Sequence, residues 1–254
     1  MAKEVINDLL GYDGIKIIQR PDMFNFSLDS TLLADFAKPL TKTKKILDLG
    51  TGNAPIPLFL SLKTNAKIIG IEIQKDVFEI AKRNITLNNL DGQITILNDD
   101  IKGLSKKFEN SEFDLITCNP PFFKHKENSN VNKNDYKTIA RHEVLITLEE
   151  IIIEVKRLLK TKSSFVMVHR TERLIEIINL LTKHNFAIKR IRLVYSKKGE
   201  NSHMVLIDAS NNGSNGLKIL EPLYVHEGEE YTKEILDIFR YGKEWLYEKT
   251  KKLS

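Results

Sequence analysis

Two short motifs hold residues whose types and spacing could do chemistry, and the first is a glycine-rich turn. The run DLGTG extends from Asp48 to Gly52. Gly50 and Gly52 let the backbone turn tightly and approach a ligand closely. About twenty residues further on, Glu72 could accept hydrogen bonds from both hydroxyls of an adenosine ribose. The pattern predicts an adenosine-containing ligand, with a surface carboxylate as the alternative for Glu72. Pro55 replaces the third glycine of a dinucleotide motif, which argues against a dinucleotide.

The second motif is the run NPPF, from Asn119 to Phe122. Pro120 and Pro121 fix the backbone and remove two N–H donors, so the side-chain oxygen of Asn119 and the carbonyl of Pro120 remain as acceptors. Two acceptors that hold the N–H bonds of an exocyclic amino group orient its nitrogen lone pair toward an electrophile. Phe122 offers a ring face on which a planar base can stack. The motif predicts chemistry on a ring-bound amine, with a rigid strand-end turn as the alternative.

Both motifs follow short apolar runs that alternate with amphipathic helical segments. This alternation predicts an α/β fold with a doubly wound, mostly parallel seven-stranded sheet. The last two strands are joined by a short turn around Gly199, so the final strand is expected to be antiparallel. Ligands of such sheets bind at the carboxyl ends of the strands, where both motifs lie. The expected strands cover residues 44–50, 66–73, 93–98, 113–119, 163–169, 186–196 and 202–210, and the expected helices between them cover 55–63, 76–89, 147–159 and 171–184.

Composition excludes several classes of protein. The chain has 254 residues and one cysteine, Cys118, so an intrachain disulfide and four-cysteine metal sites are excluded. The histidines lack metal-ligand spacing, so no metal is expected. No apolar run approaches the ~18 residues of a membrane helix, and the first ten residues lack signal-peptide features. We therefore expect a cytoplasmic monomer that does not enter the membrane. The net charge of +5 indicates a polyanionic partner, with a solvated lysine surface as the alternative.

Together the motifs resemble a known family. DLGTG, Glu72 and NPPF after a fourth strand are similar to the S-adenosylmethionine-dependent amino-group methyltransferases. The segments FNFSLDSTLLADF, GIEIQ, CNPPFF, ARHE, VHRTERL and GLKILEPL resemble the branch that includes the tRNA(Val) adenine-N6 methyltransferases. That branch acts on the adenosine 3′ of the anticodon, at position 37. The resemblance implies a class I methyltransferase fold, S-adenosylmethionine as cofactor and tRNA as substrate. Ala54 and Pro55 depart from the family pattern, which has glycine and an aliphatic residue there.

The resemblance also assigns residue roles and a division of the chain. Residues 1–43 would be an extension packing on the cofactor site, 44–210 the methyltransferase domain, and 211–254 a tail with a helix from Thr232. Asp29 would close over the methionine portion, and Asp99 is the register alternative to Asp100 as the adenine ligand. The implied catalytic residues are Asn119, Pro120, Pro121 and Phe122. The implied cofactor-binding residues are Asp29, Asp48, Gly50, Thr51, Gly52, Glu72, Ile73, Asp100, Ile101 and Asn119.

Basic residues gather around the expected site. The polar loop 121–142 carries five basic residues against two acidic ones, and further basic residues follow the fifth and sixth strands. A basic rim beside a pocket for an amino group suits a phosphate backbone. Lysine-rich loops that reflect composition alone are the alternative. The expected RNA-contacting residues are Lys124, Lys126, Arg141, His142, His169, Arg170, Lys197 and Lys198.

Three other functions compete with adenine methylation in tRNA. Enzymes that methylate the side-chain amide of glutamine in proteins, and those that methylate amino groups in rRNA, fit the same motif. A non-catalytic RNA-binding module that keeps the fold is an alternative of another class. A cysteine nucleophile is not favoured, because Cys118 lies within an apolar strand and reads as part of the core. The intact Glu72 and NPPF favour catalysis.

Overall fold

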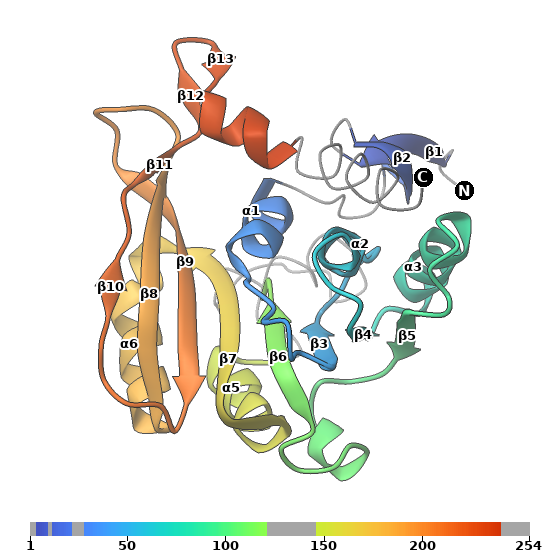
Figure 1. Cartoon of the computed structure of the whole chain (residues 1–254), viewed down its shortest axis with the longest axis horizontal. Helices are drawn as coiled ribbons and strands as arrows, with labels where there is room; N and C mark the ends of the chain where they lie inside the picture. The colour runs from blue at the N-terminus through green and yellow to red at the C-terminus, as the bar shows by residue number, and fades with distance from the viewer. Residues whose placement is uncertain (1–3, 10–11, 22–27, 121–145, 240–254) are drawn as a thin grey trace, which may run out of the picture.

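A computed structural model of the chain describes residues 4–9, 12–21, 28–120 and 146–239. A central sheet lies between two layers of helices (Figure 1). One face packs against α1 (Leu28–Phe36), α2 (Pro55–Ser61) and α3 (Lys75–Leu87), and the other packs against α5 (Leu148–Leu158) and α6 (Leu174–Lys183). None of the helices in the described ranges is long and apolar enough to cross a bilayer.

Seven long strands form the body of the sheet, as predicted. Their order is β5-β4-β3-β6-β7-β9-β8, and all run parallel except β9, which is antiparallel to both of its neighbours. The α/β fold class with an antiparallel strand from a C-terminal hairpin is therefore confirmed. The bounds are β3 (Lys45–Leu49), β4 (Lys67–Glu72), β5 (Ile94–Asn98), β6 (Phe113–Cys118), β7 (Leu159–Arg170), β8 (Phe186–Tyr195) and β9 (Ser202–Asn211).

The tail adds two short strands that the sequence did not predict. β10 (Lys218–Ile219) and β11 (Leu223–Tyr224) both pair parallel with β8, which extends the sheet to nine strands. A hairpin of β12 (His226–Glu227) and β13 (Glu230–Tyr231) follows, and residues 233–239 are helical. The hydroxyl of Thr232 accepts a hydrogen bond from the Ile235 amide at 3.4 Å, so the helix begins at the predicted cap.

The N-terminal residues form a hairpin that reaches the turn after β3. β1 (Val5–Leu9) pairs antiparallel with β2 (Tyr12–Gln19). The side chain of Asn84 on α3 accepts from the Ile18 amide at 2.6 Å and donates to the Asn53 carbonyl at 2.8 Å. One buried amide thus ties β2 to the glycine-rich turn. The division into residues 1–43, 44–210 and 211–254 remains a prediction.

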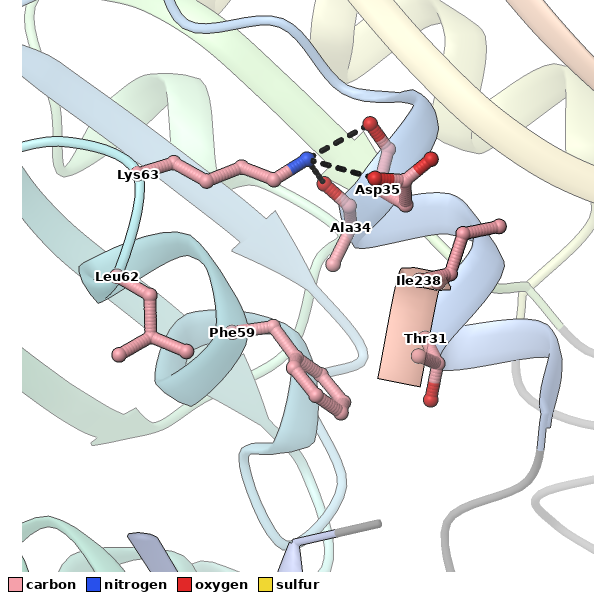
Figure 2. A pocket seen from close by; sticks show the side chains of 7 residues that line it. All are labelled: Thr31, Ala34, Asp35, Phe59, Leu62, Lys63 and Ile238. Atoms are coloured by element: carbon pink, nitrogen blue, oxygen red, sulfur yellow. Dashed lines mark hydrogen bonds and ion pairs between the residues drawn. The ribbon is translucent and has the colours of Figure 1, made fainter. Parts of the chain in front are cut away.

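Side chains fix the ends of two helices that matter for the site. Thr147 and Glu150, three residues apart, form a capping box at the start of α5. Lys63, just beyond α2, donates to the carbonyl oxygens of Ala34 and Asp35 at 2.7 Å each (Figure 2). These carbonyls end α1, and a cation there satisfies their free acceptors. Burial lowers the pKa of the Lys63 amine. α1 is therefore anchored on α2 at its carboxyl end.

Candidate active site

The glycine-rich turn leaves an open space at the carboxyl-terminal edge of the parallel strands, called the ligand edge below. Gly50 and Gly52 have φ angles of 66° and 57°, and a Cβ added at either would meet nothing within 4 Å. Ala54 has a φ of 70°, in the left-handed region where the family pattern has glycine. The Thr51 amide donates to the Ile71 carbonyl at 2.8 Å, which ties the turn to β4. A ligand can approach this backbone closely.

Asp48 places a fully buried carboxylate beneath this turn. Its Oδ1 accepts a hydrogen bond from the Thr117 hydroxyl on β6 at 2.6 Å. Its Oδ2 has no hydrogen-bond partner among the described residues. Burial, with a contribution from nearby Glu72, raises the pKa of the Asp48 carboxyl to about 7. Because unpaired buried carboxylate oxygens are costly, this atom has the properties of a ligand-binding group.

Glu72 closes the space at the end of β4. Its Oε2 accepts from the Gly52 amide at 3.0 Å, and its Oε1 accepts from the Gln74 amide at 2.8 Å. Burial raises the pKa of this carboxyl. Asn98, at the end of β5, donates to the carbonyl oxygens of Glu72 and Ile73 at 2.8 and 3.0 Å. Asn98 therefore fixes the strand end that carries Glu72, and the exposed Ile73 side chain lies next to it.

Asp99 and Asp100, which follow β5, have different surroundings. Asp99 forms an ion pair with Lys107, and its Oδ1 accepts from the Asp100 amide at 2.8 Å. Asp100 has no ion pair among the described residues, and its Oδ1 accepts from the Lys102 amide at 2.9 Å. Ile101 packs against the core on the α5 face. Asp100 thus lacks the ion pair that engages Asp99, and its role as the adenine ligand remains a prediction.

Asn119 follows β6 at the same edge, and its orientation is set by α1. Its Nδ2 donates to the Ser30 hydroxyl at 3.3 Å, and Ser30 is itself buried on α1. None of the described residues donates to the Asn119 Oδ1, so this oxygen remains an acceptor. Pro120 is buried beside it. Pro121 and Phe122 lie outside the described residues.

Comparison with known families decides the class to which this site belongs. The family model described as a methyltransferase domain matches residues 40–194, more than half of the chain. The chain belongs to the methyltransferase domain family.

Relatives and solved structures agree with this assignment. The chain is similar to a tRNA1(Val) (adenine(37)-N6)-methyltransferase of Shewanella halifaxensis, with 26% identity over 174 residues, 68% of this chain and 69% of the relative. A protein of the same name from Porphyromonas gingivalis is 35% identical over 132 residues, half of each chain. In fold it resembles a "predicted O-methyltransferase" from Agrobacterium tumefaciens (TM-score 0.67, 18% identity, 85% of this chain and 97% of that one).

The methyltransferase takes S-adenosylmethionine as its cofactor, and the residues at the ligand edge fit this molecule. The unpaired Oδ2 of Asp48 suits the ammonium group of its methionine portion. The open space over Gly50 and Gly52 admits a ligand against the backbone. The buried Thr51 hydroxyl and Gln74 Oε1 also have no hydrogen-bond partners among the described residues. Within those residues, no three potential metal ligands gather.

Apart from His169, the expected RNA-contacting residues of the methyltransferase fall into three groups. Arg170 ends β7 at the ligand edge, and Lys198 is exposed in the turn after β8. Lys197 lies 3.4 Å from the carboxylate of Glu229, in the turn between β12 and β13, so part of its charge is neutralised. The remaining ones, Lys124, Lys126, Arg141 and His142, lie outside the described residues.

The expectation that His169 contacts RNA is wrong, because its side chain is fully buried. Successive residues of a strand point to opposite faces, so His169 and Arg170 cannot share one. The His169 Nδ1 accepts from the Arg170 amide at 2.7 Å. Burial, with the nearby positive charge of Arg173, lowers the pKa of His169 to about 3. The imidazole is neutral at physiological pH and belongs to the packing under the strand end.

Two residues of the methyltransferase site were missed at the level of sequence. Ser30 orients Asn119, and the only signal was a hydroxyl directly after the predicted Asp29. Asn98 joins the ends of β4 and β5, and its signal was an amide that closes an apolar strand. Asp29 lies in the first turn of α1, where its charge acts on His203 of β9. Its expected contact with the methionine portion remains a prediction.

Proposed function

We propose that this protein transfers a methyl group from S-adenosylmethionine to the N6 amine of adenosine 37 in tRNA(Val). The observation that carries the proposal is the state of Asn119 at the ligand edge. Its Nδ2 is committed to Ser30, which leaves Oδ1 as an acceptor beside the buried Pro120. Two neighbouring acceptor oxygens, the Asn119 Oδ1 and the Pro120 carbonyl, suit a substrate that presents two N–H bonds, as an exocyclic amine does. The names of the similar tRNA methyltransferases support this choice of amine.

Residues of the first half of the ligand edge would hold the cofactor. Bound S-adenosylmethionine supplies an electrophilic methyl group on a sulfonium centre. The Asp48 carboxylate would accept hydrogen bonds from its ammonium group, and Glu72 those of its ribose hydroxyls. Asp100 would accept from the adenine amino group, beside the apolar surfaces of Ile73 and Ile101. Gly50, Thr51 and Gly52 would allow the close approach of the methionine portion.

Asn119 and Pro120 would act on the target amine. An amine conjugated to a purine ring is a weak nucleophile, because its lone pair is shared with the ring. As this nitrogen bonds to the methyl carbon, the carbon–sulfur bond would break and leave its electron pair on sulfur. The nitrogen loses its conjugation and gains positive charge, and it would return to neutrality by losing one N–H proton to water. The oxygens of Asn119 and Pro120, as acceptors from its N–H bonds, would stabilise that charge more than they stabilise the bound ground state. These two residues should therefore act on turnover rather than on affinity.

The substrate reaches this site only if the target base leaves its stack. Enzymes that modify a base extrude it into a pocket, and a single-stranded loop such as the one 3′ of an anticodon costs little to open. Phe122, outside the described residues, is the aromatic ring proposed to stack on it. Arg170 and Lys198 would contribute to binding of the phosphate backbone. A tRNA substrate implies action in the cytoplasm.

The test is nucleoside mass spectrometry after reaction of the purified protein with S-adenosylmethionine and tRNA(Val) transcripts. We expect N6-methyladenosine at position 37, and none in a transcript with guanosine there or with the Asn119→Ala protein. Methylation of rRNA or of a protein glutamine amide, with tRNA left unmodified, would contradict the proposal. Binding of cofactor and tRNA without product would identify a non-catalytic module instead.

A further inference from the structure

We propose that Arg170 and His203 bind the phosphate group of the target nucleotide, an inference that rests on the proposed function. The two residues lie on the strands next to Asn119 in the order β6-β7-β9. Neighbouring strands are about 4.8 Å apart, so the row from Asn119 to His203 has roughly the size of one nucleotide.

The register of the sheet places this row at one height. Cys118 pairs with Met167, so Arg170 lies only two residues beyond the level of Asn119. Arg170 in turn pairs with Met204, next to His203. Asn119 reaches Ser30 on α1, and therefore points to the α1 face of the sheet.

Arg170 points to the same face as Asn119. It alternates along β7 with the buried His169, so it shares the face of Val166 and Val168. Both valines belong to the core cluster that includes the α1 residues Leu32 and Leu33. The Arg170 side chain therefore lies on the α1 side of the sheet, as that of Asn119 does.

A β-bulge places His203 in this row. Val194 pairs with Met204 and Tyr195 with Ser202, which leaves His203 as the one extra residue on β9. A bulge redirects a side chain relative to the regular alternation of its strand, and such bulges are frequent next to active sites. The Ser202 hydroxyl lies 3.0 Å from the carbonyl oxygens of Val194 and Met204. The same hydroxyl lies 2.9 Å from that of Thr171, which joins the bulge to the end of β7.

The charged groups that act on His203 come from β7, α1 and the β8–β9 turn. Burial lowers the pKa of its imidazole, and the positive charge of Arg170 lowers it further. Asp29 of α1 and Glu200 of the β8–β9 turn act in the opposite direction. His203 thus offers a ring N–H as a hydrogen-bond donor, and Arg170 provides the positive charge. A planar guanidinium with an adjacent N–H donor is the combination that phosphate oxygens accept.

The ligand edge has two halves, and the half assigned to the cofactor leaves the other for the ribose and phosphate of the target nucleotide. The half over β3, β4 and β5 carries the carboxylates of Asp48, Glu72 and Asp100, and the cofactor is assigned to it. A base held at Asn119 can therefore extend its ribose and phosphate only over β7 and β9. Arg170 ends β7 and His203 lies near the start of β9. Figure 1 shows these two strands beside β6. The carboxylates of the first half repel phosphate, and the guanidinium of Arg170 in the second half attracts it.

The experiment removes the charge of one phosphate and the side chain of Arg170 or His203, first singly and then in combination. tRNA(Val) is ligated from fragments with either a normal or an uncharged methylphosphonate linkage 5′ or 3′ of adenosine 37. Single-turnover kcat/KM is measured for the parent, Arg170→Ala and His203→Ala. With the parent, we expect neutralisation of one linkage to lower kcat/KM by about 10-fold, as for loss of a charge-assisted contact. With Arg170→Ala or His203→Ala, neutralisation of the same linkage should lower kcat/KM by less than about 2-fold, because the substitution has already removed the contact.

Controls separate this result from misfolding and from failure of the proposed function. Arg157→Ala on α5 and His184→Ala after α6 are matched substitutions away from the ligand edge, and should behave like the parent. All variants should keep the parent affinity for S-adenosylmethionine. Equal losses from neutralisation in the parent and in the two site variants would overturn the inference. No methylation of the unmodified tRNA by the parent would instead overturn the proposed function.

Discussion

At the scale of single residues, Asp48 shows how a binding group is prepared before its ligand arrives. Its carboxylate is buried, half satisfied by Thr117, and has a pKa near 7 because burial disfavours the charged form. Such a group destabilises the free protein at neutral pH. A cationic ligand would favour the charged form, so binding and deprotonation of Asp48 are coupled.

The cost of this carboxylate can be measured through pH. The usual pKa of 3.8 applies in the unfolded chain, so between about pH 4 and pH 7 the folded protein binds more protons at Asp48. Its contribution to the free energy of unfolding therefore falls as pH rises through this window. We expect Asp48→Asn to exceed the parent by roughly 2–4 kcal/mol at about pH 8 and to match it near pH 4. Urea unfolding without cofactor checks this, and an equal difference at both pH values would contradict it.

Asn119 carries the second prediction at this scale. Asn119→Ala should lower kcat by about 10²-fold or more, which corresponds to about 3 kcal/mol, with little change in affinity for S-adenosylmethionine. Asn119→Asp keeps an acceptor oxygen and should retain more activity, although a buried carboxylate adds a desolvation cost. Single-turnover methylation of tRNA by both variants is the measurement. Parent-like turnover of the alanine variant would mean that the NPPF segment is only structural.

The sequence could predict those site residues that lie in motifs, and not those that tertiary contacts create. Asp48, Glu72 and Asn119 meet at one edge because parallel strands end there. Ser30 could not be predicted, since its partner lies 89 residues away. His203 depends on a bulge, which is a property of strand pairing and not of periodicity.

At the scale of elements, the strands that carry the site could be predicted because each has enough buried residues to give a recognisable apolar run in the sequence. β10 and β11 have two residues each and form only because β8 offers a free edge, so no local signal exists for them. β1 was missed for a related reason, since four of its five residues are exposed. The start of α2 was predicted correctly, but the backbone of Ala54 before it is strained.

That strain gives a prediction for the element. In Ala54→Gly, relief of the left-handed conformation, worth about 1 kcal/mol, should offset the lost methyl group and the gain in unfolded-chain freedom. We expect the free energy of unfolding to change by less than about 0.5 kcal/mol. Ala81→Gly, a matched change at a buried site inside α3, should lose about 2 kcal/mol. Denaturant unfolding compares the two, and similar losses would show that Ala54 is unstrained.

At the scale of the whole molecule, basic surface alone does not identify the face proposed to bind RNA. A cavity of about 320 Å³ on the edge opposite to the ligand edge is lined by Lys38, Lys42, Lys160 and Lys162. A lysine-rich composition places positive charge on both edges. What distinguishes the ligand edge is that its charges are sorted, with carboxylates over β3 to β5 and Arg170 on β7.

Charge reversals on the two edges test this distinction. Lys198→Glu should raise the dissociation constant for tRNA and lower the slope of its salt dependence by about 1. Lys162→Glu, a matched reversal on the opposite edge, should leave both unchanged. Lys197→Glu should have a smaller effect than Lys198→Glu, because Glu229 already lies beside Lys197. Binding of tRNA measured over a range of salt concentrations checks this. Equal effects of Lys198→Glu and Lys162→Glu would show that the positive charge at the ligand edge reflects composition alone.

The packing of the tail on α1 has a consequence for the order in which the protein is made. Ile238, in the helical residues 233–239, lines a small pocket with Thr31 and Ala34 of α1 (Figure 2). A ribosome completes α1 early and this helix only after the whole sheet. α1, which orients Asn119 through Ser30, therefore lacks its final partner throughout most of synthesis. We therefore expect the nascent chain to stay inactive until residues 233–239 have left the ribosome, although tRNAs surround it throughout synthesis.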